Sequence, residues 1–133
     1  MNSILEEAKS LQPTLIEHRR YLHEHAETEF DLPLTVEYVT HALKEMGCEP
    51  QPIGQSGVVV MLGDKKGKTI LLRADMDALP IEEQADLPYK ASNGNMHACG
   101  HDLHTTMLLG AAKLLKQHEQ ELNGCVKLIF QPN

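Results

Sequence analysis

Three short apolar runs, separated by segments of helical periodicity, limit what this chain of 133 residues can fold into. The runs are 57–62 (GVVVML), 69–72 (TILL) and 125–130 (CVKLIF), and their length and β-branched residues are typical of strands. Turn-forming residues 63–68 join the first two runs. We therefore expect a hairpin whose second strand is continuously apolar and buried on both faces.

Apolar residues recur with helical spacing on either side of these runs. Residues 3–25 predict one amphipathic helix, or two pieces, because Pro13 removes a backbone hydrogen bond. Further helices are expected over 32–47 and over 103–124, the latter ending at an Asn-Gly pair and placing Met107 in the core. The order helix–helix–strand–strand–helix–strand indicates an α/β sheet with helices packed on it, in one domain.

Composition excludes several classes of partner. The net charge of −7 argues against nucleic acid, because phosphate binding needs clustered Lys and Arg. No apolar run approaches the ~20 residues that span a bilayer, and the first residues lack the pattern of a secretory signal, so we expect no membrane partner. Three distant cysteines do not make a disulfide framework. These features predict a cytoplasmic protein.

Metal-binding side chains gather at the start of the third predicted helix. The pattern H-x-C-x-H-D-x-H is formed by His97, Cys99, His101, Asp102 and His104. In an extended segment the thiol and the imidazole two residues apart point to the same side and could share a metal. The positive end of the helix would also favour the thiolate. Capping residues and solvated surface are the alternative for this segment.

Two carboxylates, Asp75 and Asp77, follow the second apolar run at its carboxyl end. Ligands of open α/β sheets bind in the crevice beyond such strand ends. The alternative is an N-cap or a salt bridge to Arg73. Together with the Cys/His group, the pair favours a site for one or two divalent ions. A solvated helix face is expected from His18, Arg19, Arg20, Tyr21 and His23, and a functional role is the alternative for His23.

Three stretches resemble a known family: "RRYLHEHAETEF", "LLRADMDALPI" and "MHACGHDLHTTMLLGAA". The chain is similar to the amidohydrolases of the aminoacylase and carboxypeptidase metallopeptidase family. The most similar branch is that of hippurate hydrolase, N-acyl-amino-acid amidohydrolase and the plant indoleacetyl-amino-acid hydrolases. The resemblance implies that residues 1–133 are the N-terminal portion of a three-layer α/β/α, zinc-exopeptidase-like catalytic domain. In family members this domain is followed by a smaller dimerisation domain.

The resemblance also implies roles for individual residues. Cys99 and His101 match two metal ligands of a two-metal site, with zinc, manganese, nickel or cobalt as candidate ions. Asp75 and Asp77 match the acidic pair that orients a ligand and supports catalysis. We expect His97, Asp102 and His104 to act behind the ligands or toward the substrate. The implied reaction is hydrolysis of an N-acyl amino acid by metal-activated water.

Family members continue from Ile-Phe-Gln-Pro into two glutamates, a general base and a metal ligand, whereas this chain stops at Asn133. We therefore expect a truncated domain without the dimerisation domain, inactive alone and prone to self-association through an uncovered strand. Two alternatives remain open. The chain could be a small non-catalytic metal-binding or interaction module, or a redox-sensing protein built on Cys99.

Overall fold

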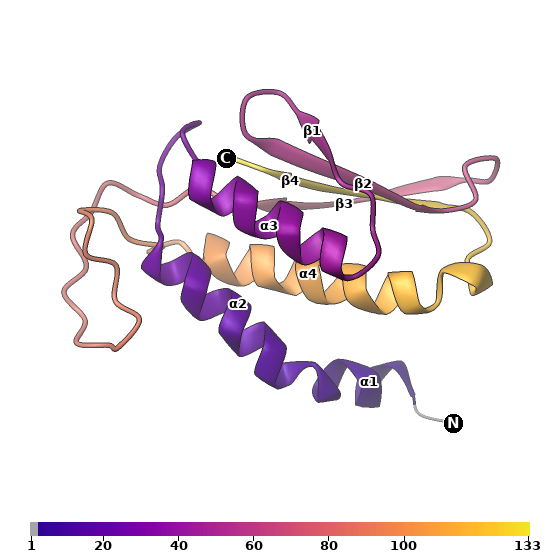
Figure 1. The fold of residues 1–133 in the computed structure, drawn as a ribbon, viewed down its shortest axis with the longest axis horizontal. Helices are drawn as coiled ribbons and strands as arrows, with labels where there is room; N and C mark the ends of the chain where they lie inside the picture. The colour runs from indigo at the N-terminus through magenta and orange to yellow at the C-terminus, as the bar shows by residue number, and fades with distance from the viewer. Residues whose placement is uncertain (1–2) are drawn as a thin grey trace.

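A mixed four-stranded sheet with helices on one of its faces forms the structure, a computed structural model that describes residues 3–133 (Figure 1). In chain order the elements are α1 (Ile4–Ser10), α2 (Gln12–Glu24), α3 (Pro33–Glu45), β1 (Gln51–Ile53), β2 (Gly57–Gly63), β3 (Thr69–Asp75), α4 (His101–Gln117), the 3-10 helix η1 (Glu119–Glu121) and β4 (Cys125–Gln131). Helices α3 and α4 lie next to the sheet, and α1 and α2 lie beyond α4 on the same side (Figure 1). The expected α/β class is confirmed, with one of the two expected helical layers present among these residues.

The predicted hairpin between β2 and β3 is wrong, because β4 lies between them in the sheet order β1-β2-β4-β3. Strand β2 pairs with β4 antiparallel, and β3 pairs with β4 parallel. Parallel neighbours need a long crossover, and α4 supplies it between β3 and β4. The central position suits β4, whose Leu128 and Phe130 are fully buried.

Strand β3 is an edge strand, which contradicts the expected burial of both its faces. Its side chains Ile70 and Leu71 are 63% and 55% exposed. The continuous apolar run therefore did not predict burial correctly here. It belongs to a strand with one paired neighbour among the described residues. Only the carboxyl end of β3 is enclosed, where Ala74 is buried.

Most expected helices occur, with shifted ends. The N-terminal helix is divided into α1 and α2, and Pro13 lies in the first turn of α2, where the missing N–H costs nothing. Helix α4 ends at Gln117 and is followed by η1, so the Asn-Gly pair at 123–124 is not its stop.

Strand β1 was not expected. No helix among residues 3–133 combines the length and the apolar character needed to cross a membrane.

The core lies between the sheet and helices α3 and α4. Its largest fully buried side chains include those of Leu22, Leu43, Leu109, Leu128 and Phe130. Met107 was expected among them but is 61% exposed, because helical periodicity directs the neighbouring Leu108 and Leu109 inward instead.

Candidate metal centre

The two predicted clusters meet where β3 ends and α4 begins. Asp75 is the last residue of β3, and His101 is the first residue of α4. The ring of His101 lies between the two carboxylates: Nδ1 is 2.8 Å from the backbone oxygen of Asp77 and 3.1 Å from its Oδ1, and Nε2 is 3.4 Å from Asp75 Oδ2. Asp77 and Asp75 precede His101 by 24 and 26 positions in the chain, and both thus lie beside it at the end of β3.

The contact with Asp77 determines which nitrogen of His101 carries the proton. A backbone carbonyl oxygen only accepts hydrogen bonds, so Nδ1 of His101 must donate. In the neutral ring the lone pair is then on Nε2, which faces Asp75. This is the arrangement by which carboxylates and carbonyls orient metal-binding histidines.

A third donor, His104, lies one helical turn after His101. Its Nδ1 donates a hydrogen bond of 2.7 Å to Asp75 Oδ1. One ligand atom from each of Asp75, His101 and His104 lies within 4.8 Å of the others. Partial burial alone would raise the pKa of Asp75, but the hydrogen bond from His104 and the electrostatic effect of the neighbouring His101 outweigh it and lower that pKa. Asp75 is therefore an ionised ligand candidate at neutral pH.

The donor set fits a divalent cation. One carboxylate oxygen and two imidazole nitrogens are ligands that zinc and several first-row transition metals accept. An open cavity of about 530 Å³ adjoins Asp75 and His104; it is also lined by Arg73 and by the apolar side chains Leu72, Ala74, Met107, Leu108 and Ala111. A volume of this size is typical of small-molecule sites.

Cys99, the other predicted ligand, is exposed and is not a member of this three-residue cluster. His97 is buried, and neither of its ring nitrogens has a hydrogen-bond partner among residues 3–133. Burial lowers the pKa of His97 to about 4, against the opposing charge of Asp102. His97 is therefore a neutral imidazole without a hydrogen-bond partner among the described residues. The roles expected for Cys99 and His97 stay predictions.

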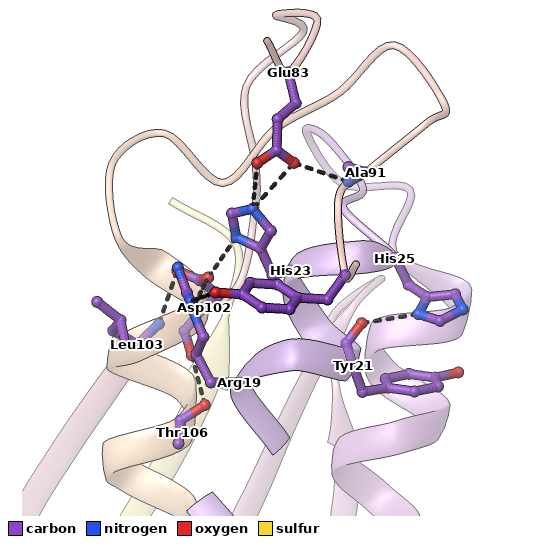
Figure 2. Close-up of polar contacts among 10 residues, drawn as sticks. Arg19, Tyr21, His23, His25, Glu83, Ala91, Asp102, Leu103 and Thr106 are labelled. Carbon is purple, nitrogen blue, oxygen red and sulfur yellow. Dashed lines mark hydrogen bonds and ion pairs between the residues drawn. The ribbon is translucent and has the colours of Figure 1, made fainter. Parts of the chain in front are cut away.

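Asp102 is buried, and its carboxylate contacts the side chains of Arg19 and His23 (Figure 2). Its Oδ2 accepts hydrogen bonds from Arg19 Nε at 2.9 Å and from His23 Nδ1 at 2.8 Å. The expectation that His23 belongs to a solvated face is wrong, since its exposed fraction is 2%. Sequence reasoning missed Arg19 and Glu83 and gave a functional role of His23 only as the alternative. The available signal was the four-residue spacing of Arg19 and His23, which puts both on one helix face.

These features define an α/β protein with a metal-type donor cluster at the carboxyl end of a parallel strand. Comparison with known families agrees: residues 71–133 match the family described as peptidase family M20/M25/M40. The match begins within β3 and covers the segment that leads to α4 and the elements that follow, and so includes every candidate ligand.

The chain is similar to curated enzymes from several organisms. It is 45% identical over 126 residues to N-acetyl-L-cysteine deacetylase of Bacillus subtilis, covering 92% of this chain and 30% of that protein. It is 48% identical over 135 residues to hippurate hydrolase of Campylobacter jejuni, covering 98% and 34%. It is 48% identical over 116 residues to IAA-amino acid hydrolase ILR1-like 5 of Arabidopsis thaliana, covering 86% and 27%. The chain thus spans about a third of the length of these relatives.

A solved structure has the same fold. The YXEP protein of Bacillus subtilis, described as a dinuclear metal-binding peptidase of the M20 family, superposes with a TM-score of 0.87 at 43% identity. The superposition covers 93% of this chain and 36% of that one. The resemblance inferred from the motifs is therefore confirmed.

Proposed function

We propose that this chain is the N-terminal portion of the catalytic domain of a metal-dependent amidohydrolase and contributes one side of its metal site. The observation that carries the proposal is the cluster of Asp75, His101 and His104, with the tautomer of His101 set by Asp77. Its location at a strand end, beside an open cavity, is where α/β enzymes bind ligands.

The substrate class we propose is the N-acyl amino acid. The three relatives reported above are named for an N-acetyl amino acid, for hippurate and for IAA-amino acids. The amino-acid conjugate is common to these names, and the acyl part differs.

The metal is proposed to be a divalent ion, two of them in the complete site. Cys99 and His101 would hold it, as the motif resemblance implies, with Asp75 and His104 beside them. Thiolate favours zinc, nickel or cobalt, and the carboxylate and imidazole donors also admit manganese. When bound, such an ion supplies Lewis-acid chemistry that activates water and polarises the amide carbonyl.

Among the described residues, the carboxylates near the cluster orient this site, and none of them is free to act as a general base. Asp75 accepts from His104, Asp77 accepts from His101 and from the backbone N–H of Asn133, and Asp102 accepts from Arg19 and His23. Each carboxylate near the cluster is thus already engaged. We therefore propose that the 133-residue chain does not turn over substrate alone.

Metal binding is tested by calorimetric titration of the chain with zinc chloride at pH 7.5. We expect binding with proton release that weakens below neutral pH, because imidazole and thiolate ligands bind deprotonated. His101→Ala should weaken binding by more than about tenfold, since the loss of an orienting partner alone costs 10–100-fold. His41→Ala is the matched control, because His41 is an exposed histidine of α3 that pairs only with Glu45 in the described structure. Equal zinc affinity in wild type and His101→Ala would contradict the proposal.

The role of Cys99 is tested separately with cobalt. A thiolate ligand produces a charge-transfer band in the near ultraviolet, which should disappear in Cys99→Ser and persist in Cys48→Ser. A spectrum without that band would remove Cys99 from the ligand set. Release of amino acid from N-acetyl or N-benzoyl substrates by the chain, lost in Cys99→Ala, would contradict the proposed inactivity.

Other features of the protein are proposed from its surface and composition. We propose a cytoplasmic location, supported by the three unpaired cysteines. The net charge of −7 supports small-molecule substrates in preference to nucleic acid, and we propose no membrane partner.

The exposed apolar side chains Ile70 and Leu71 of β3 support self-association through this edge.

A further inference from the structure

We propose that His23 is a buried imidazolium and a positioning residue that orients His101 through Asp102. The part of this role that concerns the metal site rests on the proposed function. The inference comes from the network of Arg19, His23, Glu83 and Asp102, which we call the buried ion network (Figure 2).

His23 lies between two buried carboxylates. Its Nδ1 is 2.8 Å from Asp102 Oδ2, and its Nε2 is 2.9 Å from Glu83 Oε2 and 3.1 Å from Glu83 Oε1. The side chains of Glu83 and Asp102 are 0% and 1% exposed. Ionised carboxylates only accept hydrogen bonds, so the ring satisfies both when both of its nitrogens carry a hydrogen.

Charge balance supports the same protonation state. Two carboxylates and Arg19 leave the buried ion network with one uncompensated negative charge, and an imidazolium at His23 brings the sum to zero. Glu83 also accepts a 2.8 Å hydrogen bond from the backbone N–H of Ala91. Burial alone would raise the pKa of Glu83, but the hydrogen bonds from His23 and Ala91 lower it overall, which keeps this carboxyl ionised.

Two further rings face His23 without bonding to it. The edge of Tyr89 is at a centroid distance of 5.8 Å, and the ring of His97 is at 6.4 Å. His97 has no partner of its own among residues 3–133, so it does not compete for either carboxylate.

The network joins three segments that surround the candidate ligands. His23 and Arg19 come from α2, and Glu83 comes from the long segment between β3 and α4. Asp102 lies in the first turn of α4, where its Oδ1 accepts from the backbone N–H of Leu103 at 2.9 Å. Asp102, which follows His101 directly in the chain, is thus held in place by residues outside α4. Loss of His23 should loosen the first turn of α4 and, with it, the contact of His101 with Asp77.

The protonation state is tested by nitrogen NMR of the histidine rings in the metal-free chain at pH 7. We expect both ring nitrogens of His23 to show imidazolium shifts and couplings to their own hydrogens. The shift of an unprotonated nitrogen at either position would overturn the proposal. This readout needs no metal and no activity, so it is independent of the proposed function.

A charge-balance rescue tests the same point by stability. His23→Gln leaves a buried negative charge uncompensated and should shift the unfolding equilibrium by on the order of a hundredfold. The double variant His23→Gln/Glu83→Gln restores a net charge of zero and should recover most of that loss. A double variant as unstable as the single one would show that His23 is neutral in the wild type.

The positioning role is read from the ring of His101. In the wild type, Nδ1 of His101 should be the protonated nitrogen, whereas the double variant should show a mixture of tautomers or exchange broadening. His25→Gln is the matched control, since His25 follows the same helix and bonds only the backbone oxygen of Tyr21. Wild-type His101 signals in the folded double variant would refute the positioning role.

Discussion

Gly100 separates the candidate ligands Cys99 and His101, and its backbone conformation directs both. It is the N-cap of α4 with φ +83° and ψ +17°, in the left-handed region that glycine adopts without cost. A Cβ atom there would meet nothing within 4 Å. The left-handed backbone conformation, and not a lack of space for a side chain, therefore favours glycine at this position.

Substitution of Gly100 should separate these two causes. Gly100→Ala should lower the free energy of unfolding by about 1 kcal/mol because L-alanine disfavours the left-handed region. Gly100→Asn should cost less, because asparagine adopts this region more readily. Urea unfolding of the two variants measures the difference. Equal losses would mean that the backbone conformation is not what selects glycine.

At the scale of elements, α3 depends on a residue that precedes it by six positions. Glu27 accepts hydrogen bonds from the backbone N–H groups of Thr35 and Leu34, at 2.7 and 3.2 Å, and from the Thr35 hydroxyl at 2.7 Å. The N-cap residue, Leu32, makes no side-chain cap of its own. A carboxylate from the preceding turn therefore satisfies the free N–H groups and complements the helix dipole.

Removal of this remote cap should destabilise the chain measurably. Glu27→Ala should cost about 1 kcal/mol, the usual value of a lost N-cap, and Glu27→Gln should cost less because an acceptor remains. Glu37→Gln, an exposed change in the middle of α3, controls for the loss of charge. The three variants are compared by thermal unfolding. A Glu27→Ala variant as stable as Glu37→Gln would contradict the capping role.

A pH-dependent contact attaches α1 to the segment after α4. His118 pairs with Glu7 through Nε2 and with Glu121 through Nδ1, both at 2.6 Å. Hydrogen bonds to these two carboxylates raise the pKa of His118 above its ordinary value. The contact therefore stabilises the fold fully below about pH 6.5, the pKa of an unfolded histidine, and is lost as pH rises through the higher folded pKa.

The stability difference between wild type and His118→Gln should accordingly be larger at pH 6 than at pH 9. Urea unfolding at the two pH values measures it. His41→Gln serves as the control, since His41 pairs within its own helix and does not join separate elements. A difference that is the same at both pH values would contradict the contribution of charged His118.

For the molecule as a whole, the exposed edge of the sheet is the main liability. Strand β3 pairs only with β4 among the described strands, and it carries Ile70 and Leu71 in exposed positions. Unpaired backbone groups beside apolar side chains are a template for pairing with another chain. By contrast, helices α3 and α4 cover the core beneath strands β2 and β4.

The proposed self-association should depend on this edge. The average sedimentation coefficient of the wild-type chain should rise with concentration, and Ile70→Lys should reduce that rise by placing a charge on the edge strand. Ile81→Lys is the matched control, because Ile81 is an exposed isoleucine outside the sheet. A wild-type chain that stays monomeric at every concentration would contradict the proposal.

Local signals predicted much of the element structure and part of the site. The strand runs and the helical periodicity predicted all major elements except β1, because both depend on neighbours in the chain. The approach of His101 to Asp75 and Asp77 could also be predicted from positions in the chain. The two carboxylates lie at the end of a strand, and His101 lies at the start of a helix. The motif spacing alone carried the resemblance to the M20 family.

Non-local partners were beyond the reach of these patterns. The insertion of β4 between β2 and β3 reverses the expected hairpin, and periodicity cannot report which strands pair. His23 was expected in solvent because a helical pattern describes only its own faces, while Glu83, 60 residues away, encloses it. Likewise, nothing local distinguishes the apolar edge strand β3 from a buried one.

By itself, the sequence determined the element types, the α/β class and the identity of the chemical groups at the strand end, because these depend on contacts of a few residues. Only the tertiary structure decided strand order, the burial of His23 and the proton position on His101. Each of these is set by hydrogen bonds between segments far apart in the chain, whose free energy exists only after the fold brings them together.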